Sequence, residues 1–330
     1  MPLPERSLIS RIRQQLRSRL PNRSRFSNGG KGGRVIAGIG DDCSVLRIPT
    51  GHEALVTTDF SLEGVHFRRE WHPPESVGHR CLARGLSDIA AMGGEPIAAF
   101  LSLALPANLP QRWVDKFLQG LLKLANEFSV RLAGGDTSQS PDGVLADVVV
   151  LGSVPKGKAV LRSGARPGDR IYVTGELGAS AATLDLFYSN RKKRLKVEPH
   201  PQHFYPTPRI EVGRLLRRKG IPSSMIDLSD GLSTDLAHIC EESGAGAEVL
   251  ENAIPRDVEL KFALHGGDDY ELLFTAPPAI HVPRSIAGVQ VTQIGHMIRG
   301  KGIALLHDRD ARSDLRPRGW EHFTTASRRK

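Results

Sequence analysis

Short apolar runs alternate with helical patterns along this 330-residue chain, and the alternation is interrupted once, near the middle. The interruption, residues 155–169 (PKGKAVLRSGARPGD), is rich in Gly, Pro and basic residues and shows no period. Strands alternating with helices predict a mixed α/β fold, and the restart of the pattern predicts two domains. The expected parts are an N-terminal arm at 1–34, an N-terminal domain at 35–156 and a C-terminal α/β domain at 157–330.

Each side of the interruption has its own set of expected elements. In the N-terminal domain, apolar runs and periodic stretches predict strands and helices, in order, at 53–60, 74–94, 97–106, 110–129 and 145–154. In the C-terminal domain they predict further elements at 169–175, 179–189, 209–220, 224–244, 247–251, 270–276 and 289–295.

The composition is that of an ordinary soluble globular protein, with 39% apolar and 25% charged residues. No run of about 18 apolar residues is present, so no membrane span is expected. The three cysteines, Cys43, Cys81 and Cys240, are widely spaced and include no CxxC pair. This pattern predicts free thiols in the cytoplasm and argues against a disulfide framework or a zinc site.

The N-terminal arm is strongly basic, in a chain whose formal net charge is +9. Residues 7–20 predict a short amphipathic helix with one apolar face, formed by Leu8, Ile9, Ile12, Leu16 and Leu20. The favoured interpretation is a surface helix followed by a flexible linker. Contact with a nucleic acid or another acidic surface is the alternative, but no zinc finger or RNA-recognition signature supports it.

One segment fits the spacing of a phosphate-binding P-loop, but it lacks the chemistry of one. Residues 152–159 read GSVPKGKA, which places Ala159 where a magnesium-binding Ser or Thr is required. The residues that follow have no helical period, so no helix N-terminus would face the phosphates. A nucleotide site would have to be built in another way.

Six short segments place carboxylates beside Gly, Ser or Thr, at the expected ends of strands or helices. Their polar members are Asp41 and Asp42; Thr57, Thr58 and Asp59; Asp88; Asp136; Asp227, Ser229 and Asp230; and Asp268, Asp269 and Glu271. Each segment alone has a structural explanation, because Asp is common in turns and at helix N-caps. Together they favour Mg²⁺, which takes oxygen ligands and bridges carboxylates to phosphates. The set therefore indicates metal-assisted phosphoryl transfer without a P-loop lysine.

Eight motifs of the chain occur in the order found in thiamine-monophosphate kinases. They are GIGDDCSVL, TTDFSLEGVHF, LSDIAAMGGEP, GGDTSQSP, LRSGARPGD, IDLSDGLSTDL, GGDDYELLFT and GWEHF. The chain therefore resembles this family, which belongs to the superfamily of aminoimidazole ribonucleotide synthetase, over residues 35–323.

The resemblance implies a fold, a reaction and an assembly. It implies an aminoimidazole ribonucleotide synthetase-like α/β (α+β) fold, with an ATP- and magnesium-binding N-terminal domain whose mixed sheet and helices form the core of a homodimer. It also implies that ATP phosphorylates thiamine monophosphate to thiamine diphosphate with several Mg²⁺ ions. The acceptor phosphate is largely dianionic at neutral pH, so no residue is assigned as a general base.

The resemblance also assigns roles to individual residues. The implied metal ligands are Asp41 (as a ligand or a neighbour of one), Asp42, Thr57, Thr58, Asp59, Asp88, Asp136, Asp227 and Asp230. The implied ATP contacts are Gly135, Asp136, Arg162 and Ser229, and the implied thiamine-phosphate contacts are His66, Asp268 and Trp320. Cys43 lies beside the acids without a nucleophile motif and is expected to be small and buried.

Three positions depart from the usual family pattern. Asp268 stands where a Glu is usual, Trp320 stands where a Tyr is usual, and Gly85 stands where an Asn is usual. Because Gly is a poor helix former, Gly85 puts the local geometry of the helix that carries Asp88 in question.

Two alternative functions remain open at this point. One is another ATP- and magnesium-dependent enzyme of the superfamily, such as aminoimidazole ribonucleotide synthetase or selenophosphate synthetase. The other is a non-catalytic nucleotide- or nucleic-acid-binding protein that uses the basic arm.

Overall fold

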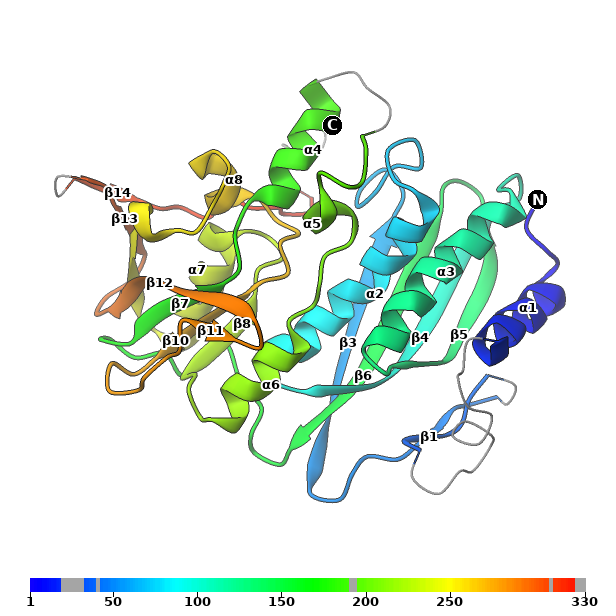
Figure 1. Ribbon diagram of the computed structural model, residues 1–330, viewed down its shortest axis with the longest axis horizontal. Helices are drawn as coiled ribbons and strands as arrows, with labels where there is room; N and C mark the ends of the chain where they lie inside the picture. The colour runs from blue at the N-terminus through cyan, green and yellow to red at the C-terminus, as the bar shows by residue number, and fades with distance from the viewer. Residues whose placement is uncertain (19–32, 40–41, 190–194, 309–310, 324–330) are drawn as a thin grey trace. The chain divides into compact units, whose positions relative to one another are not determined.

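The computed structural model describes residues 1–18, 33–39, 42–189, 195–308 and 311–323 (Figure 1). The chain divides into two compact units. Unit 1 holds Met1–Ile89 and Gly94–Gly157, and unit 2 holds Ala90–Gly93 and nearly all of the chain from Lys158 onwards. In the described part of the chain, no helix has the length and apolar character needed to cross a membrane.

Unit 1 is built on a four-stranded sheet in the order β3-β6-β4-β5. The strands are β3 (His52–Leu62), β6 (Leu145–Pro155), β4 (Glu95–Pro106) and β5 (Arg131–Ser140). The pair β4–β5 is parallel, and the other two pairs are antiparallel. The helices α2 (Pro74–Ala91) and α3 (Gln111–Glu127) lie against one face of this sheet (Figure 1).

Helices α2 and α3 are in backbone contact, which two glycines permit. A Cβ atom added at Gly78 would lie 1.9 Å from the carbonyl oxygen of Phe117, and one at Gly120 would lie 1.8 Å from that of Glu75. Side chains on the inner face of β6, such as Val148 and Val150, are fully buried beneath the helices. The period-2 alternation of the strands thus separates a covered face from an open one.

The N-terminal helix α1 (Glu5–Ser18) is part of unit 1. Leu8 and Ile12 are buried, and the Arg11 guanidinium forms a double ion pair with Asp115 of α3. The amide of Leu3 also donates to Gln111 Oε1 at 2.7 Å. The predicted helix is therefore confirmed up to Ser18, and its apolar face is packed rather than free. Leu20 and most of the predicted linker lie outside the described residues. Two short strands, β1 (Val35–Ala37) and β2 (Val45–Leu46), pair in the segment after it.

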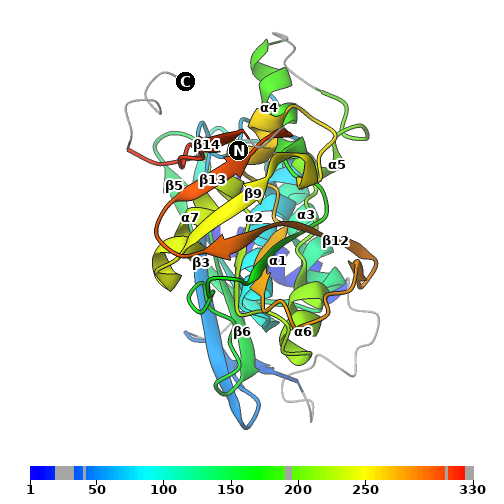
Figure 2. The ribbon, with the colours of Figure 1, turned by 90° about the vertical axis from the view of Figure 1, so that its left-hand side faces the viewer.

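Unit 2 has a larger mixed sheet in the order β14-β13-β9-β12-β7-β10-β8, with β11 beside β12. Figure 2 shows β13, β9 and β12 side by side in this sheet. The strands are β7 (Arg170–Thr174), β8 (Ser224–Asp227), β9 (Gly246–Leu250), β10 (Leu272–Ala276), β11 (Ser285–Ile286), β12 (Val289–Ile298), β13 (Ile303–Leu306) and β14 (Arg312–Asp314). The helices are α4 (Ala179–Ser189), α5 (Pro201–Phe204), α6 (Ile210–Arg218), α7 (Leu232–Ser243), α8 (Leu260–His265) and the 3₁₀ turn η1 (Glu251–Ala253). The apolar core includes Leu236 and Ile239 of α7 and Ile294 of β12.

The predicted two-domain α/β architecture is confirmed, but three strands of unit 1, β1, β2 and β5, were not expected. Strand β5 reads RLAGGDTSQS, which has no apolar alternation, and Asp136 was expected at the end of an element. Asp136 instead lies inside β5, opposite Ser102 of β4. Pairing with β4 thus overrides the weak strand preference of Gly and Asp. In unit 2, the elements β11, β13, β14, α5, α8 and η1 are likewise additional to the expected ones.

Candidate functional site

Two of the predicted metal ligands, Asp59 and Asp88, meet between the sheet and a helix of unit 1. Asp59 lies on the covered face of β3, and Asp88 lies near the end of α2. Their carboxyl groups are close enough for each to affect the other, and the hydroxyl of Thr57 donates to Asp88. The three oxygen-bearing side chains therefore form one small cluster of the kind that Mg²⁺ prefers.

The electrostatics of this pair favour a cation. Burial raises the pKa of Asp59 to about 7, and the charge of Asp88 adds to the rise. The guanidinium of Arg84, which donates to the Phe60 carbonyl at 2.9 Å, opposes it only in part. Two carboxylates this close cannot both ionise readily without a positive partner.

Gly85 does not disrupt the helix that carries Asp88, because α2 runs without a break from Pro74 to Ala91. A Cβ atom at Gly85 would lie 2.6 Å from Cγ2 of Val150 and 3.5 Å from Cγ2 of Thr57. The missing side chain therefore allows the helix to approach the sheet closely at the turn before Asp88.

Thr58 lies on the opposite, open face of β3, where it meets an acid that sequence reasoning missed. Its hydroxyl donates to Oδ1 of Asp147 at 2.7 Å. Asp147 lies on β6, paired with Phe60 on one side and with Ser102 on the other. The signal was a single charge inside the apolar run LADVVVLG, which on a strand must point away from the covered face.

The loop that carries Asp42 is attached to the strand that carries Asp136. The hydroxyl of Ser44 donates to the Ala133 carbonyl at 2.7 Å, three residues before Asp136. Asp42 and Asp136 are both exposed, and Asp41 lies outside the described residues. Gly135 adopts a φ of 141°, and a Cβ atom there would lie 1.9 Å from the Leu101 carbonyl oxygen. This glycine is therefore required by the close pairing of β5 with β4.

Two predicted contacts, His66 and Arg162, lie in a turn of unit 1 and in the irregular segment before β7 of unit 2. The amide of Leu62 donates to Nδ1 of His66 at 3.0 Å, so the ring ties the turn after β3 and its Nδ1 carries no proton. Arg162 has an exposed side chain, and its carbonyl accepts the Ser243 hydroxyl at 3.3 Å.

In unit 2, the predicted ligands Asp227 and Asp230 lie at the end of β8 and in the loop that follows. This loop, residues 228–231, is called the acidic loop below. Oδ2 of Asp235 accepts the amides of Ser229, Asp230 and Gly231 at 3.1, 3.1 and 3.0 Å. Burial raises the pKa of Asp235 to about 8, with the charges of Asp227 and Asp230 adding to the rise and the loop amides opposing it. Sequence reasoning did not single out Asp235.

The acidic loop also touches both predicted substrate contacts of unit 2. The Asp268 amide donates to the Ser229 carbonyl at 2.8 Å, and the Trp320 amide donates to the Asp230 carbonyl at 3.2 Å. The hydroxyl of Tyr270 donates to Oδ1 of Asp268 at 2.5 Å. The structure thus brings Ser229, Asp230, Asp268 and Trp320 together on three adjoining segments.

The three acids from Asp268 to Glu271 have different roles. Asp268 is the predicted substrate contact described above, whereas Asp269 and Glu271 bind other parts of unit 2. Asp269 accepts the Gly178 amide at 2.8 Å before α4, and burial raises its pKa well above the usual range. Glu271 is buried and forms a double ion pair with Arg209, while Thr174 also donates to it. Asp269 and Glu271 therefore hold the fold.

Cys43 was expected to be buried, and this was wrong. It is exposed beside Asp42, because the residues on either side of it belong to an open bend rather than to a packed element. Cys81 and Cys240 are buried, and all three cysteines are free thiols, as predicted.

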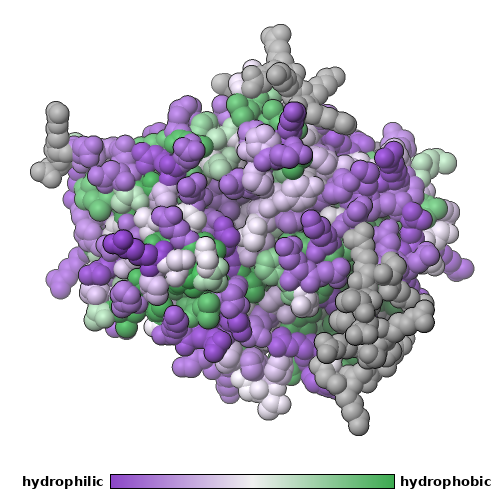
Figure 3. Space-filling view, in the orientation of Figure 1, coloured by the Kyte–Doolittle hydropathy of each residue, from purple (hydrophilic) through white to green (hydrophobic). Residues whose placement is uncertain are grey.

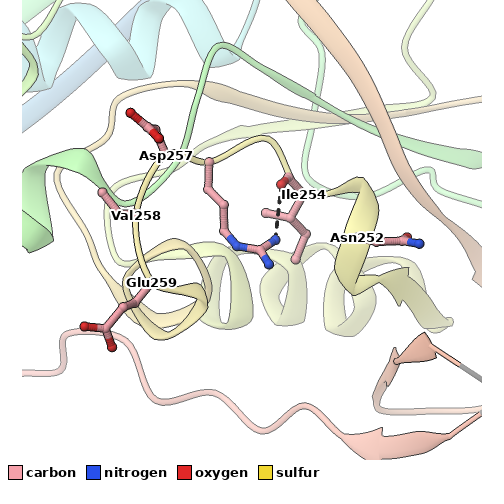
Figure 4. A pocket seen from close by; sticks show the side chains of 6 residues that line it. Asn252, Ile254, Asp257, Val258 and Glu259 are labelled. Atoms are coloured by element: carbon pink, nitrogen blue, oxygen red, sulfur yellow. Dashed lines mark hydrogen bonds between the residues drawn. The ribbon is translucent and has the colours of Figure 1, made fainter.

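A pocket of about 690 Å³ on unit 2 is lined by the single segment from Asn252 to Glu259 (Figure 4). Its Arg256 donates to the carbonyls of Glu251 and Ile254 at 2.8 and 3.3 Å, so the guanidinium braces its own segment. None of the predicted site residues lines this pocket, and it is not the candidate site.

The candidate ligands are oxygen donors, which suit magnesium, but they are dispersed over the chain. Among the residues that the structure describes, no three His, Cys, Asp or Glu side chains converge closely enough to hold an ion by themselves. The paired carboxyls of Asp59 and Asp88, with the Thr57 hydroxyl, supply hard ligands whose mutual repulsion a divalent cation would relieve. The residues present are therefore compatible with Mg²⁺.

Comparison with known proteins identifies related families in both halves of the chain and a relative that matches nearly all of it. Residues 40–154 match the family "AIR synthase related protein, N-terminal domain", and residues 166–308 match its C-terminal domain. A thiamine-monophosphate kinase of Salmonella typhimurium is 38% identical, over 98% of this chain and 100% of the relative.

Solved structures agree in fold over nearly the whole chain. The thiamine-monophosphate kinase from Stenotrophomonas maltophilia K279a aligns with a TM-score of 0.77 and 32% identity, over 92% of this chain and 97% of that one. AaThiL complexed with AMPPCP and TMP aligns with a TM-score of 0.74 and 30% identity, over 98% of this chain and 99% of that one.

Proposed function

Because the chain belongs to the thiamine-monophosphate kinase family, we propose that it transfers the terminal phosphoryl group of ATP to thiamine monophosphate, releasing ADP and thiamine diphosphate. One observation in unit 2 carries this proposal best. The expected nucleotide residue Ser229 and the expected thiamine-phosphate residues Asp268 and Trp320 lie on directly bonded backbone segments. A kinase that joins two phosphates needs its two substrate sites side by side.

The reaction requires neutralisation of the phosphate charges more than it requires proton transfer. The acceptor phosphate has its second pKa near ~6 and is largely dianionic at neutral pH, so it is already a nucleophile. Two unit charges ~4 Å apart repel by roughly 4 kcal/mol at a protein-like dielectric, and two phosphate groups carry several such charges. The protein must therefore supply cation sites and fixed positions.

Several magnesium ions fit this requirement, and the candidate ligands divide between the two units. In unit 1 they are Asp42, Thr57, Thr58, Asp59, Asp88 and Asp136, with Asp41 as a further member; in unit 2 they are Asp227 and Asp230. When bound, the ions would neutralise phosphate charge and hold the reacting oxygens in line. Gly135, Asp136, Arg162 and Ser229 are the proposed ATP contacts.

The thiamine end is assigned to three side chains. Trp320 is 36% exposed and offers a flat surface on which an aromatic ring can stack. Asp268, held by Tyr270, offers a negative charge to the cationic thiamine ring system. His66 is the third proposed contact.

The test is to incubate the protein with ATP, Mg²⁺ and thiamine monophosphate and to separate the thiamine phosphates by chromatography. We expect thiamine diphosphate to form only with Mg²⁺ and not from free thiamine. Asp59→Asn and Asp42→Asn are expected to lose most of the activity, because each removes a ligand charge. Asp142→Asn, an exposed turn residue of unit 1, serves as the matched control and is expected to retain it.

Absence of thiamine diphosphate, with ATP still bound, would contradict the proposal. The substrates of sister enzymes in the superfamily would then be the next to test. Binding of RNA or ATP without any turnover would favour the non-catalytic alternative, with a steep dependence on salt.

We also propose that the protein is a homodimer that pairs through the open face of the sheet in unit 1. Val56 and Phe60 of β3 are 66% and 57% exposed on this face, which is unusual for apolar residues in the middle of a strand. The face of the molecule drawn in Figure 3 is mostly hydrophilic outside the grey atoms, with several groups of apolar residues.

Molecular mass in solution tests this assembly. A double change, Val56→Glu with Phe60→Glu, is expected to give monomers by light scattering, because buried like charges repel across a symmetric contact. Leu250→Glu, at an exposed apolar residue of unit 2, is the control and is expected to leave the mass unchanged. A wild-type protein of monomeric mass would contradict the proposal.

We place the reaction in the cytoplasm, which supplies ATP. The three free cysteines support a reducing environment.

A further inference from the structure

The acidic loop is held from within by one buried carboxylate. Asp235, in the first turn of α7, is 1% exposed, and its Oδ2 accepts the three consecutive amides of residues 229–231. Consecutive amides of this kind form a concave site that elsewhere binds a phosphate. Here the protein's own carboxylate fills that site. Phosphates must therefore be recognised at this loop by side chains and metal ions.

While the amides of the loop point toward Asp235, its carbonyls are bonded to other segments. The carbonyls of Leu228 and Ser229 accept the amides of Tyr270 and Asp268 at 2.9 and 2.8 Å, and that of Asp230 accepts the amide of Trp320. The acidic loop therefore has a structural side, at Asp235, and a side that carries the thiamine-end residues.

Two glycines allow the neighbouring segments to approach the acidic loop closely. A Cβ atom at Gly267 would lie 2.3 Å from the Ser229 carbonyl oxygen, and one at Gly319 would lie 2.0 Å from that of Asp230. Asp268 and Tyr270 also adopt positive φ angles of 63° and 53°, which non-glycine residues rarely adopt without surrounding restraint. A small shift of the acidic loop would therefore displace Asp268 and Trp320 with it.

We propose that Asp235 is a positioning residue that holds the nucleotide-side residues Ser229 and Asp230 in register with the thiamine-side residues Asp268 and Trp320, so that binding of one substrate favours binding of the other. This inference rests on the proposed function. Its basis is the set of backbone hydrogen bonds that joins both groups of residues to one loop.

The experiment compares three single variants of the full-length protein. Asp235→Asn keeps the size of the side chain but replaces one carboxyl oxygen with an NH2 donor in a buried site, and it is expected to raise the KM of both ATP and thiamine monophosphate roughly tenfold, because the side chain then holds the three loop amides less well. Tyr270→Phe removes only the bond to Asp268 and is expected to raise the KM of thiamine monophosphate alone.

The third variant is the matched control. Asp169 is also a buried carboxylate of unit 2 and accepts the Arg166 amide at 3.0 Å and the Ser223 hydroxyl at 2.6 Å. Asp169 lies directly before the start of β7, whereas Asp227 lies near the opposite end of this strand, at Thr174. The control residue is therefore at the other end of the strand from the acidic loop. Asp169→Asn is expected to leave both KM values within about twofold of wild type.

Titration calorimetry measures how much one ligand strengthens the binding of the other, and a general loss of stability would not selectively remove this effect. In the wild type, thiamine monophosphate is expected to bind more tightly when Mg²⁺ and AMPPCP are present, and in Asp235→Asn this gain is expected to be lost. Unchanged coupling and unchanged KM values in a folded Asp235→Asn would overturn the inference, as would equal effects in Asp169→Asn.

Hydrogen exchange on the wild type covers the case in which Asp235→Asn does not fold. The amides of residues 229–231 are expected to exchange as slowly as those of α7 in the absence of ligands. Rapid exchange there would overturn the inference. If the wild type binds both ligands with coupling but makes no thiamine diphosphate, the proposed reaction fails while the role of Asp235 stands.

Discussion

The carboxyl groups of Asp59 and Asp88 interact across the contact of β3 with α2, where burial and the charge of Asp88 raise the pKa of Asp59. This environment favours a proton on the pair. A bound proton and a bound cation are therefore alternative ways of offsetting the charge at the same place.

The pair predicts how the stability of the metal-free protein depends on pH. The pKa of Asp59 is about 7 in the folded protein, above the ordinary value of 3.8, so the folded state holds this proton more tightly than the unfolded state does. The stabilisation is present below about pH 4 and is lost as the pH rises toward and through 7. Asp235, with a folded pKa of about 8, acts in the same direction.

Asp59→Asn is accordingly expected to make the metal-free protein more stable at pH 8, by at least about 1 kcal/mol in the free energy of unfolding. The amide cannot ionise, so it avoids the cost that the buried carboxylate bears at this pH. Urea unfolding in EDTA at pH 5 and pH 8 measures this. A variant less stable than the wild type at pH 8 would contradict the prediction.

Magnesium binding is expected to release protons near pH 6.5, because a cation beside Asp59 favours its ionised form. Titration calorimetry in two buffers of different ionisation enthalpy measures the number released. The release is expected to vanish in Asp59→Asn and to persist in Asp142→Asn. Equal release in all three proteins would show that Asp59 does not take part.

Asp147 is expected to matter through the Thr58 hydroxyl that it accepts at 2.7 Å. Asp147→Ala removes the acceptor and is expected to raise the Mg²⁺ concentration needed for half-maximal activity about tenfold. Asp147→Asn keeps an acceptor oxygen and is expected to restore most of this loss. If Asn is as damaging as Ala, the charge of Asp147 matters rather than its bond to Thr58.

The ion pair of Arg209 with buried Glu271 is expected to carry stability rather than catalysis. Arg209→Ala leaves a buried carboxylate without its partner and is expected to cost about 3 kcal/mol in the free energy of unfolding. Arg214→Ala, on helix α6, which begins directly after Arg209, removes a more exposed pair with Glu211 and is expected to cost less than about 1 kcal/mol. Thermal and urea unfolding of the two variants give the comparison.

The parts of the fold with clear apolar periodicity were predictable from the sequence. Helices α2 and α3 and strands β4 and β6 follow their apolar patterns, because burial against one another decides their structure. Strand β5 could not be predicted in this way. Its Gly and polar residues acquire strand structure only from the neighbouring β4.

The candidate site was predictable only as a set of residue types. The resemblance pointed to Asp59 and Asp88, but nothing in the sequence shows that a residue of α2 reaches β3, since this depends on how closely the helix approaches the sheet. Asp147 and Asp235 were missed for a related reason. Their importance comes from hydrogen bonds to Thr58 and to three loop amides, which exist only in the folded chain.

Helix α1 lies before residue 40, where the match to the AIR synthase related N-terminal domain begins. A shortened chain that starts at that residue would therefore lose Leu8 and Ile12 from an apolar contact and leave Asp115 without Arg11. Its newly bared surface is expected to favour aggregation during expression. Shortening the chain to the family boundary would thus remove a piece of the fold, and a fusion partner placed directly before Leu3 would disturb the same contact.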